Sequence, residues 1–116
     1  RGLGDVYKRQ VDPRFSTWFD ALDYMCGECE KIDFDIALLG CGAYGYPLAA
    51  HIKKMGKQAI HLGGCLQILF GLKGRRWDEE EPDIVAMYND YWHYPMASEV
   101  PKGSGDVEGG TYWKKE

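Results

Sequence analysis

The sequence has little of what a membrane protein or a nucleic-acid-binding protein needs. No apolar run approaches the roughly 18 residues of a transmembrane helix, and no signal-peptide pattern is present. Basic residues never occur in runs longer than two, and 18 acidic against 14 basic residues give a formal net charge of -4. This balance argues against nucleic acid as a partner, because such proteins normally show a basic stripe. We therefore expect a cytoplasmic protein without a transmembrane segment.

The four cysteines lack the spacing of a zinc or redox site. Cys26 and Cys29 form one C-x-x-C, whereas Cys41 and Cys65 each stand alone near the end of an expected strand. A structural zinc site normally needs a second close pair of ligands, and a redox C-x-x-C opens a helix instead of lying late in one. We expect buried or half-buried free thiols in a reducing compartment, and we assign no metal ligand.

The length fits one small α/β domain, or most of one. Residues 1–10 have no periodicity and resemble the translated adapter scars found at the ends of environmental sequencing fragments, so we interpret them as non-native. Residues 11–92 are expected to form the α/β domain, as the C-terminal part of a larger one. Residues 93–116 contain prolines, glycines and aromatic residues and are expected to form an irregular extension lying across that domain.

The apolar pattern between residues 34 and 62 predicts a strand, a turn, a helix and a second strand. The first strand, Ile36 to Leu39, is uniformly apolar, as expected when both faces of a sheet are covered. The helix runs from about Pro47 to Met55, and the second strand from Gln58 to Leu62. This order implies parallel strands joined by a right-handed crossover. We expect an α/β fold, namely a partial Rossmann-like three-layer domain with a short parallel sheet flanked by helices.

Four further segments are expected outside this unit. Three of them are helices, and one is a polar loop that includes the acidic run before Pro82. The first helix is amphipathic with Ser16 or Thr17 as its cap, and the second is so apolar that it must be buried or covered by a partner. In chain order, the expected segments are a helix over 15–32, a helix over 65–71, a loop over 74–81 and a helix over 83–91.

The turn after the first strand matches the pattern G-x-G-x-x-G. Its glycines are Gly40, Gly42 and Gly45, with Ala43 and Tyr44 between the last two. Such a turn between a strand and a helix is typical of nucleotide-binding sheets. The first glycine permits a tight turn, the second lets backbone N–H groups approach a phosphate, and the third lets helix and strand pack closely. A ligand-facing loop is favoured over a merely structural turn.

The end of the second strand does not fit a standard NAD site. Such sites usually place an acidic residue there, whereas this strand ends in His61-Leu62-Gly63-Gly64 and the next acidic residue is Asp78. Another phosphate-bearing ligand is therefore favoured, with Gly63 and Gly64 as a second flexible turn at the same edge. His61 is either a ligand contact or a hydrogen-bonded structural imidazole.

Two further groups could contribute to a site. Arg75 and Arg76 could contact a diphosphate through bidentate hydrogen bonds, although exposed loop arginines are common. The segment from Tyr88 to His93 could form a pocket wall for a ring-shaped ligand, or could simply close the domain. No catalytic residue is identified, because no nucleophile–base arrangement or carboxylate pair has supporting context.

The block from Phe34 to Trp77, with 88–92 and 107–113, resembles the C-terminal part of GT-D-type glycosyltransferases. The strand and turn D-I-A-L-L-G-C-G-A-Y-G and the helix end around Lys53 to Ile60 carry the resemblance. It implies a Rossmann-like domain that binds a nucleotide-sugar donor and transfers the sugar to an acceptor. It also implies a divalent metal, Mn or Mg, on an acidic motif that would lie upstream of this segment.

The resemblance has one departure. Family members carry Gly-His and then acidic residues after the second strand, where this chain has Gly63-Gly64-Cys65-Leu66-Gln67, so those residues cannot be transferred. We expect a fragment that contributes nucleotide-diphosphate binding and is inactive alone. The alternatives are a fragment of an NAD(P)-binding oxidoreductase and a non-catalytic nucleotide-binding or structural module.

Overall fold

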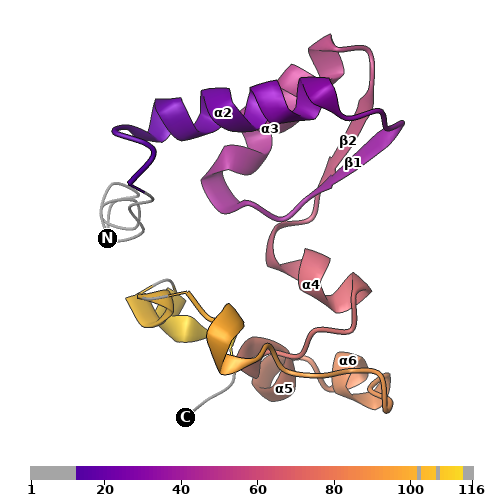
Figure 1. The fold of residues 1–116 in the computed structure, drawn as a ribbon. Helices are drawn as coiled ribbons and strands as arrows, with labels where there is room; N and C mark the ends of the chain where they lie inside the picture. The colour runs from indigo at the N-terminus through magenta and orange to yellow at the C-terminus, as the bar shows by residue number, and fades with distance from the viewer. Residues whose placement is uncertain (1–12, 102, 107, 114–116) are drawn as a thin grey trace. The chain divides into compact units, whose positions relative to one another are not determined.

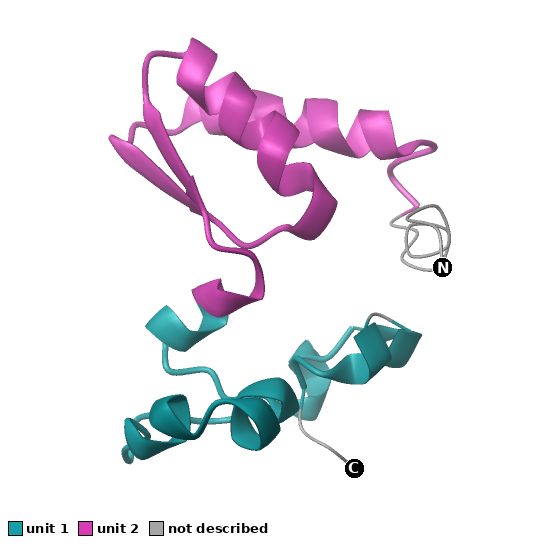
Figure 2. Cartoon of the chain, turned by 180° about the vertical axis from the view of Figure 1, so that it is seen from behind, with its two compact units in different colours: residues 1–11, 67–116 teal, residues 12–66 magenta. Residues whose placement is uncertain are grey.

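The computed structural model describes residues 13–101, 103–106 and 108–113. The expected adapter scar, residues 1–10, lies outside the described residues. The chain divides into two compact units, shown in different colours in Figure 2. We call residues 12–66 the strand unit and residues 67–116 the C-terminal unit. The domain expected over 11–92 spans both units, and each is described by itself.

The strand unit contains the elements that the sequence predicted around the glycine turn (Figure 1). Its two strands pair in parallel, with Ile36 opposite Gln58 and Leu39 opposite His61. Short 3-10 turns, η1 and η2, follow the two strands. The elements in order are α2 (Trp18–Lys31), β1 (Ile36–Leu39), η1 (Gly42–Tyr44), α3 (Gly45–Lys54), β2 (Gln58–His61) and η2 (Gly63–Cys65).

A capping box fixes the start of α2. The Oγ1 atom of Thr17 accepts a hydrogen bond from the N–H of Asp20 at 3.1 Å, and Oδ2 of Asp20 accepts one from the N–H of Thr17 at 2.8 Å. This reciprocal pair satisfies two backbone donors, one of them in the first turn of the helix. Of the two predicted caps, Ser16 and Thr17, the structure therefore has Thr17.

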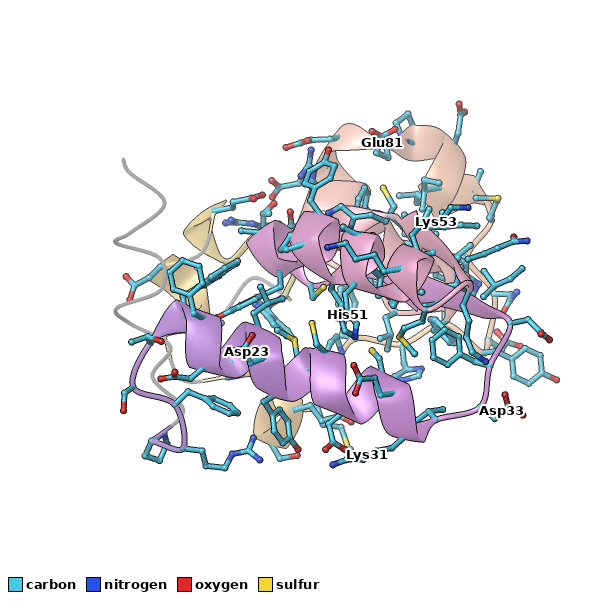
Figure 3. All side chains as sticks on the ribbon, turned by 90° about the horizontal axis from the view of Figure 1, so that it is seen from above. Asp23, Lys31, Asp33, His51, Lys53 and Glu81 are labelled. Carbon is cyan, nitrogen blue, oxygen red and sulfur yellow. The ribbon has the colours of Figure 1, made fainter. Side chains whose placement is uncertain are left out.

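The core of the strand unit lies between the two helices and one face of the strand pair. Ile52 of α3 is fully buried, and Leu39 and Leu48 are buried beside it. Half-buried residues that pack around this cluster come from both helices and both strands: Leu22, Met25, Cys26, Cys29, Ala37, Ala49, Met55 and Ala59. In addition, His51 points from α3 toward α2 (Figure 3), where its Nε2 atom lies 3.1 Å from Oε1 of Glu30.

Within the described residues of the strand unit, the other face of the strand pair is open. Ile36, Leu38 and Ile60 project from that face and are exposed. Within this unit β1 is therefore covered on one face only, and the apolar run of four residues did not reveal how many layers surround it. In the described part of the chain, the fold is a mixed α/β arrangement with a two-stranded parallel sheet.

The C-terminal unit is built from short helices and turns. Its helices are α5 (Arg75–Glu80) and α6 (Pro82–Ala86), and α4 (Leu66–Leu69) spans the division between the units. Pro82 opens α6 as predicted, but this helix ends at Ala86, well before the predicted end at residue 91. The expected polar loop over 74–81 is also wrong, because α5 forms there.

The apolar segment over 65–71 forms only η2 and one helical turn. Leu69 and Phe70 are exposed, so these two residues are not buried within the chain, and the alternative of a covering partner stays a prediction. A Gly71 backbone in the left-handed region, with φ of 67°, ends the turn. Within the described residues, no helix combines the length and apolar character needed to cross a membrane.

Candidate functional site at the carboxyl end of the strands

Two glycine turns lie side by side at the carboxyl end of the strand pair. Gly42 in η1 and Gly63 in η2 both have left-handed backbones, with φ of 55° and 58°. A Cβ atom added at Gly40 would lie 3.0 Å from the backbone oxygen of Gly63, so the two turns are in contact. Ligands of open α/β sheets bind at this edge. The predicted convergence of the two turns is therefore present.

Gly40 and Gly45 leave room for neighbouring side chains. A Cβ atom at Gly40 would lie 2.7 Å from Cδ2 of Leu66, which fills the space beside the strand end. A Cβ atom at Gly45 would overlap the ring of His61. Neither glycine has a left-handed backbone, so close packing is the reason that a glycine is needed at these two positions.

His61 connects the end of β2 to the end of β1. Its Nδ1 atom lies 3.2 Å from the carbonyl oxygen of Leu39, which also accepts a hydrogen bond from the N–H of Leu62 at 2.9 Å. A carbonyl oxygen only accepts, so Nδ1 carries the proton in this contact and Nε2 holds a lone pair in the neutral ring. Of the two expected roles, the structural imidazole is therefore present.

Part of the η1 turn is used internally. The N–H of Tyr44 donates to the carbonyl oxygen of Cys41 at 3.2 Å, and the N–H of Gly45 donates to that of Gly42. The ring of Tyr44 stacks on Trp18 of α2, with centroids 4.8 Å apart and planes 8° apart. Tyr44 thus packs against α2, while Gly42 is the exposed residue of the turn. Ala43 in η1 and Gly64 in η2 are half-buried beside it.

Tyr46 belongs to this edge, although it was not among the predicted site residues. It is the second residue of α3, its side chain is 79% exposed, and its ring meets that of His61 edge-on with centroids 5.2 Å apart. An aromatic residue directly after a glycine-rich turn is the sequence signal that could have identified it.

Arg75 and Arg76 lie in the other unit, where both hold the C-terminal segment. The Nη2 atom of Arg75 donates to the carbonyl oxygen of Gly109 at 2.6 Å. Nη1 of Arg76 lies 3.4 Å from the Tyr112 hydroxyl and 3.6 Å from Oε2 of Glu108. These arginines are part of α5, and their contacts fasten residues 108–113 to that helix. The structure therefore gives each of them a structural role.

The segment from Tyr88 to His93 forms a self-contained cluster with α5. The hydroxyls of Tyr88 and Tyr94 both donate to the Asp78 carboxylate, at 3.0 and 2.7 Å. The ammonium of Lys73 lies over both rings, 4.8 Å from the Tyr88 centroid. Burial and the Asp78 hydrogen bond together raise the pKa of Tyr88 to about 12. These contacts lie within the C-terminal unit and agree with the interpretation that the segment closes its part of the fold.

Three of the four cysteines are partly buried. Cys26, Cys29 and Cys41 are half-buried free thiols, and burial raises the pKa of each, so the unreactive neutral form is favoured at neutral pH. Cys65 is exposed, contrary to expectation. Within the described residues, no group of three or more His, Cys, Asp or Glu side chains could hold a metal ion.

The candidate site thus consists of backbone turns and ring-bearing side chains. It comprises the turn from Gly40 to Gly45, His61 with Tyr46, and the turn at Gly63 and Gly64. Comparison with protein-family models, with curated proteins and with solved structures found no match to this chain.

Proposed function

We propose that the strand unit binds the diphosphate of a nucleotide sugar at its two glycine turns. In this proposal the chain is the C-terminal part of a cytoplasmic GT-D-like glycosyltransferase with a Rossmann-like domain. Gly42 and Gly63 present backbone to the phosphates, Gly40 lets the two turns approach each other, and Gly45 leaves room for the His61 ring.

One observation carries this proposal. Two neighbouring parallel strands each end in a 3-10 turn that contains a left-handed glycine, and the two turns touch. Backbone amides in such turns bind anions, and no basic side chain is required for this. The exposure of Gly42 leaves its backbone accessible to a ligand.

The role of the described residues in this function is to bind and orient the donor. The resemblance also implies a divalent metal, but the described residues contain no cluster that fits one. We therefore derive no catalytic step through a metal, and no described side chain is assigned as a nucleophile or base. The fragment is expected to bind the donor without transferring the sugar.

A structural strand–turn–helix module is the second candidate. It is favoured by the use of the Tyr44 and Gly45 amides inside the turn, and by the His61 ring that occupies the space above Gly45. These features would also be found in a turn whose only task is to connect β1 to α3. A binding measurement separates the two candidates.

The test is a calorimetric titration of the whole chain with UDP, with and without Mn²⁺. A matched pair of variants isolates the turn: Gly42→Val at φ of 55°, and Gly56→Val at φ of 80° beyond the other end of α3. Neither added Cβ meets an atom within 4 Å, so both variants introduce similar backbone strain. If valine unfolds either variant, alanine replaces it at both positions.

The proposal predicts that UDP binds, that Gly42→Val abolishes binding, and that Gly56→Val leaves it within about twofold of the parent chain. Circular dichroism checks that both variants stay folded. Binding that is absent in the parent chain, or lost equally in both variants, would favour the structural module.

A further inference from the structure

We infer that Tyr46 is the stacking surface for the base of the bound nucleotide. This inference rests on the proposed function, because it concerns the same edge of the strand unit. It extends the site from the phosphates to the ring-shaped part of the ligand, and it identifies a nucleoside diphosphate as the ligand class.

The first argument is position. Tyr46 directly follows Gly45, the last glycine of the turn, and its ring reaches the His61 ring at the end of β2. The side chain therefore lies next to the first glycine turn and contacts the strand end that leads into the second. If the diphosphate of a ligand occupies these turns, the base of that ligand lies near the Tyr46 ring.

The second argument is orientation. The Tyr46 ring meets His61 at an interplanar angle of 73°, which is an edge-to-face contact. His61 is itself held by the Leu39 carbonyl and by the space that Gly45 leaves open. A ring supported in this way keeps a defined direction, although 79% of the side chain is exposed.

The third argument is chemistry. Aromatic side chains bind nucleobases by stacking, and this contact tolerates different bases because every base has a π-face. Exposure alone does not identify such a residue, since Phe19 of α2 is 68% exposed as well. Tyr46 differs from Phe19 because it contacts a residue of the candidate site. Phe19 is therefore a suitable control.

The experiment compares UDP with inorganic pyrophosphate, which has the phosphates but no base. Both are titrated by calorimetry into the parent chain and into Tyr46→Ala, Tyr46→Phe and Phe19→Ala. We expect Tyr46→Ala to weaken UDP binding about tenfold or more and to leave pyrophosphate binding unchanged. Tyr46→Phe and Phe19→Ala should bind UDP as the parent chain does.

Other outcomes overturn the inference in distinguishable ways. If the parent chain binds pyrophosphate but Tyr46→Ala binds UDP normally, the stacking role is wrong and the phosphate proposal stands. If Tyr46→Ala loses both ligands alike while circular dichroism shows a native fold, Tyr46 supports the turn and does not contact the base. If the parent chain binds neither ligand, the proposed function fails and the stacking role fails with it.

Discussion

At the residue scale, the space around single glycines determines how the strand ends are built. Gly45 is the clearest case, because a side chain there would occupy the position of the His61 ring. Gly27, in the middle of α2, is the opposite case, because an added Cβ would meet nothing within 4 Å. Alanine substitutions at the two positions should therefore change the free energy of unfolding in opposite directions.

Gly45→Ala should lower the free energy of unfolding by about 1–3 kcal/mol, since the His61 ring must move to admit the methyl group. Gly27→Ala should raise it by about 0.5–1 kcal/mol, because alanine is the better helix former. Urea unfolding followed by circular dichroism measures both values. A Gly45→Ala variant as stable as the parent chain would show that the close approach of His61 to residue 45 is not required.

The phenol of Tyr88 should ionise at an unusually high pH. Burial and the Asp78 hydrogen bond raise its pKa to about 12, above its ordinary value of 10.0. The folded chain then retains a proton that the unfolded chain releases, so this contribution to stability is complete below pH 10 and is lost as the pH rises toward 12. Absorbance at the wavelength of tyrosinate follows the titration.

Asp78→Asn provides the comparison for Tyr88, because it removes the charge and keeps the side-chain shape. In this variant the Tyr88 pKa should move down toward its ordinary value, since the charged hydrogen-bond partner is gone. An unchanged titration would mean that Asp78 does not hold the hydroxyl in solution.

At the element scale, α2 depends on its capping box. Thr17→Ala removes the Oγ1 acceptor of the Asp20 N–H and should lower the free energy of unfolding by about 1 kcal/mol. Ser16→Ala is the control, because Ser16 contributes its backbone N–H to the Asp20 carboxylate and keeps it after substitution. Thermal unfolding should therefore show a lower midpoint for Thr17→Ala than for Ser16→Ala; equal midpoints would contradict the role of the cap.

The elements that the sequence predicted well are those with local signals. The β1 boundaries agree with the prediction because an apolar run meets a glycine at residue 40, and α3 and β2 agree within about two residues because Gly56 separates them. The segment over 75–80 was missed for a physical reason. The N–H groups of Arg75 and Arg76 donate to the carbonyl oxygens of Trp113 and Thr111, so distant residues cap α5.

At the scale of the whole molecule, the C-terminal segment is part of the fold of its unit. The Tyr112 hydroxyl donates to Oε2 of Glu108 at 2.7 Å and lies near Arg76, while Gln67 and Gly74 approach its backbone. The expected irregular extension is thus ordered by contacts to α5 over residues 108–113.

Tyr112→Phe should loosen this attachment by about 0.5–1.5 kcal/mol, because the ring stays and only the hydroxyl contacts are lost. Hydrogen exchange should become faster for the amides of residues 75–80 and 108–113. Exchange in α3 should stay unchanged, since the Tyr112 contacts all lie in the C-terminal unit. A uniform change over both units would contradict this attachment.

The candidate site was only partly predictable from the sequence. The two glycine turns and His61 do meet, because parallel strands end at one edge and this rule needs no knowledge of side chains. The structural contacts of the two arginines could not be predicted, because their partners lie more than 30 residues away in the chain. Tyr46 was overlooked because its contact with His61 depends on the crossover that brings α3 and β2 together.

The most direct test of the central claim is an amide NMR titration of the isotope-labelled chain with UDP. Nucleotide binding at the glycine turns predicts saturable shifts for the amides of residues 40–45 and 61–64. The amides of residues 53–57, at the other end of α3, should stay in place and serve as the reference. Shifts at the reference amides alone, or no saturable shift at the turns, would contradict the claim.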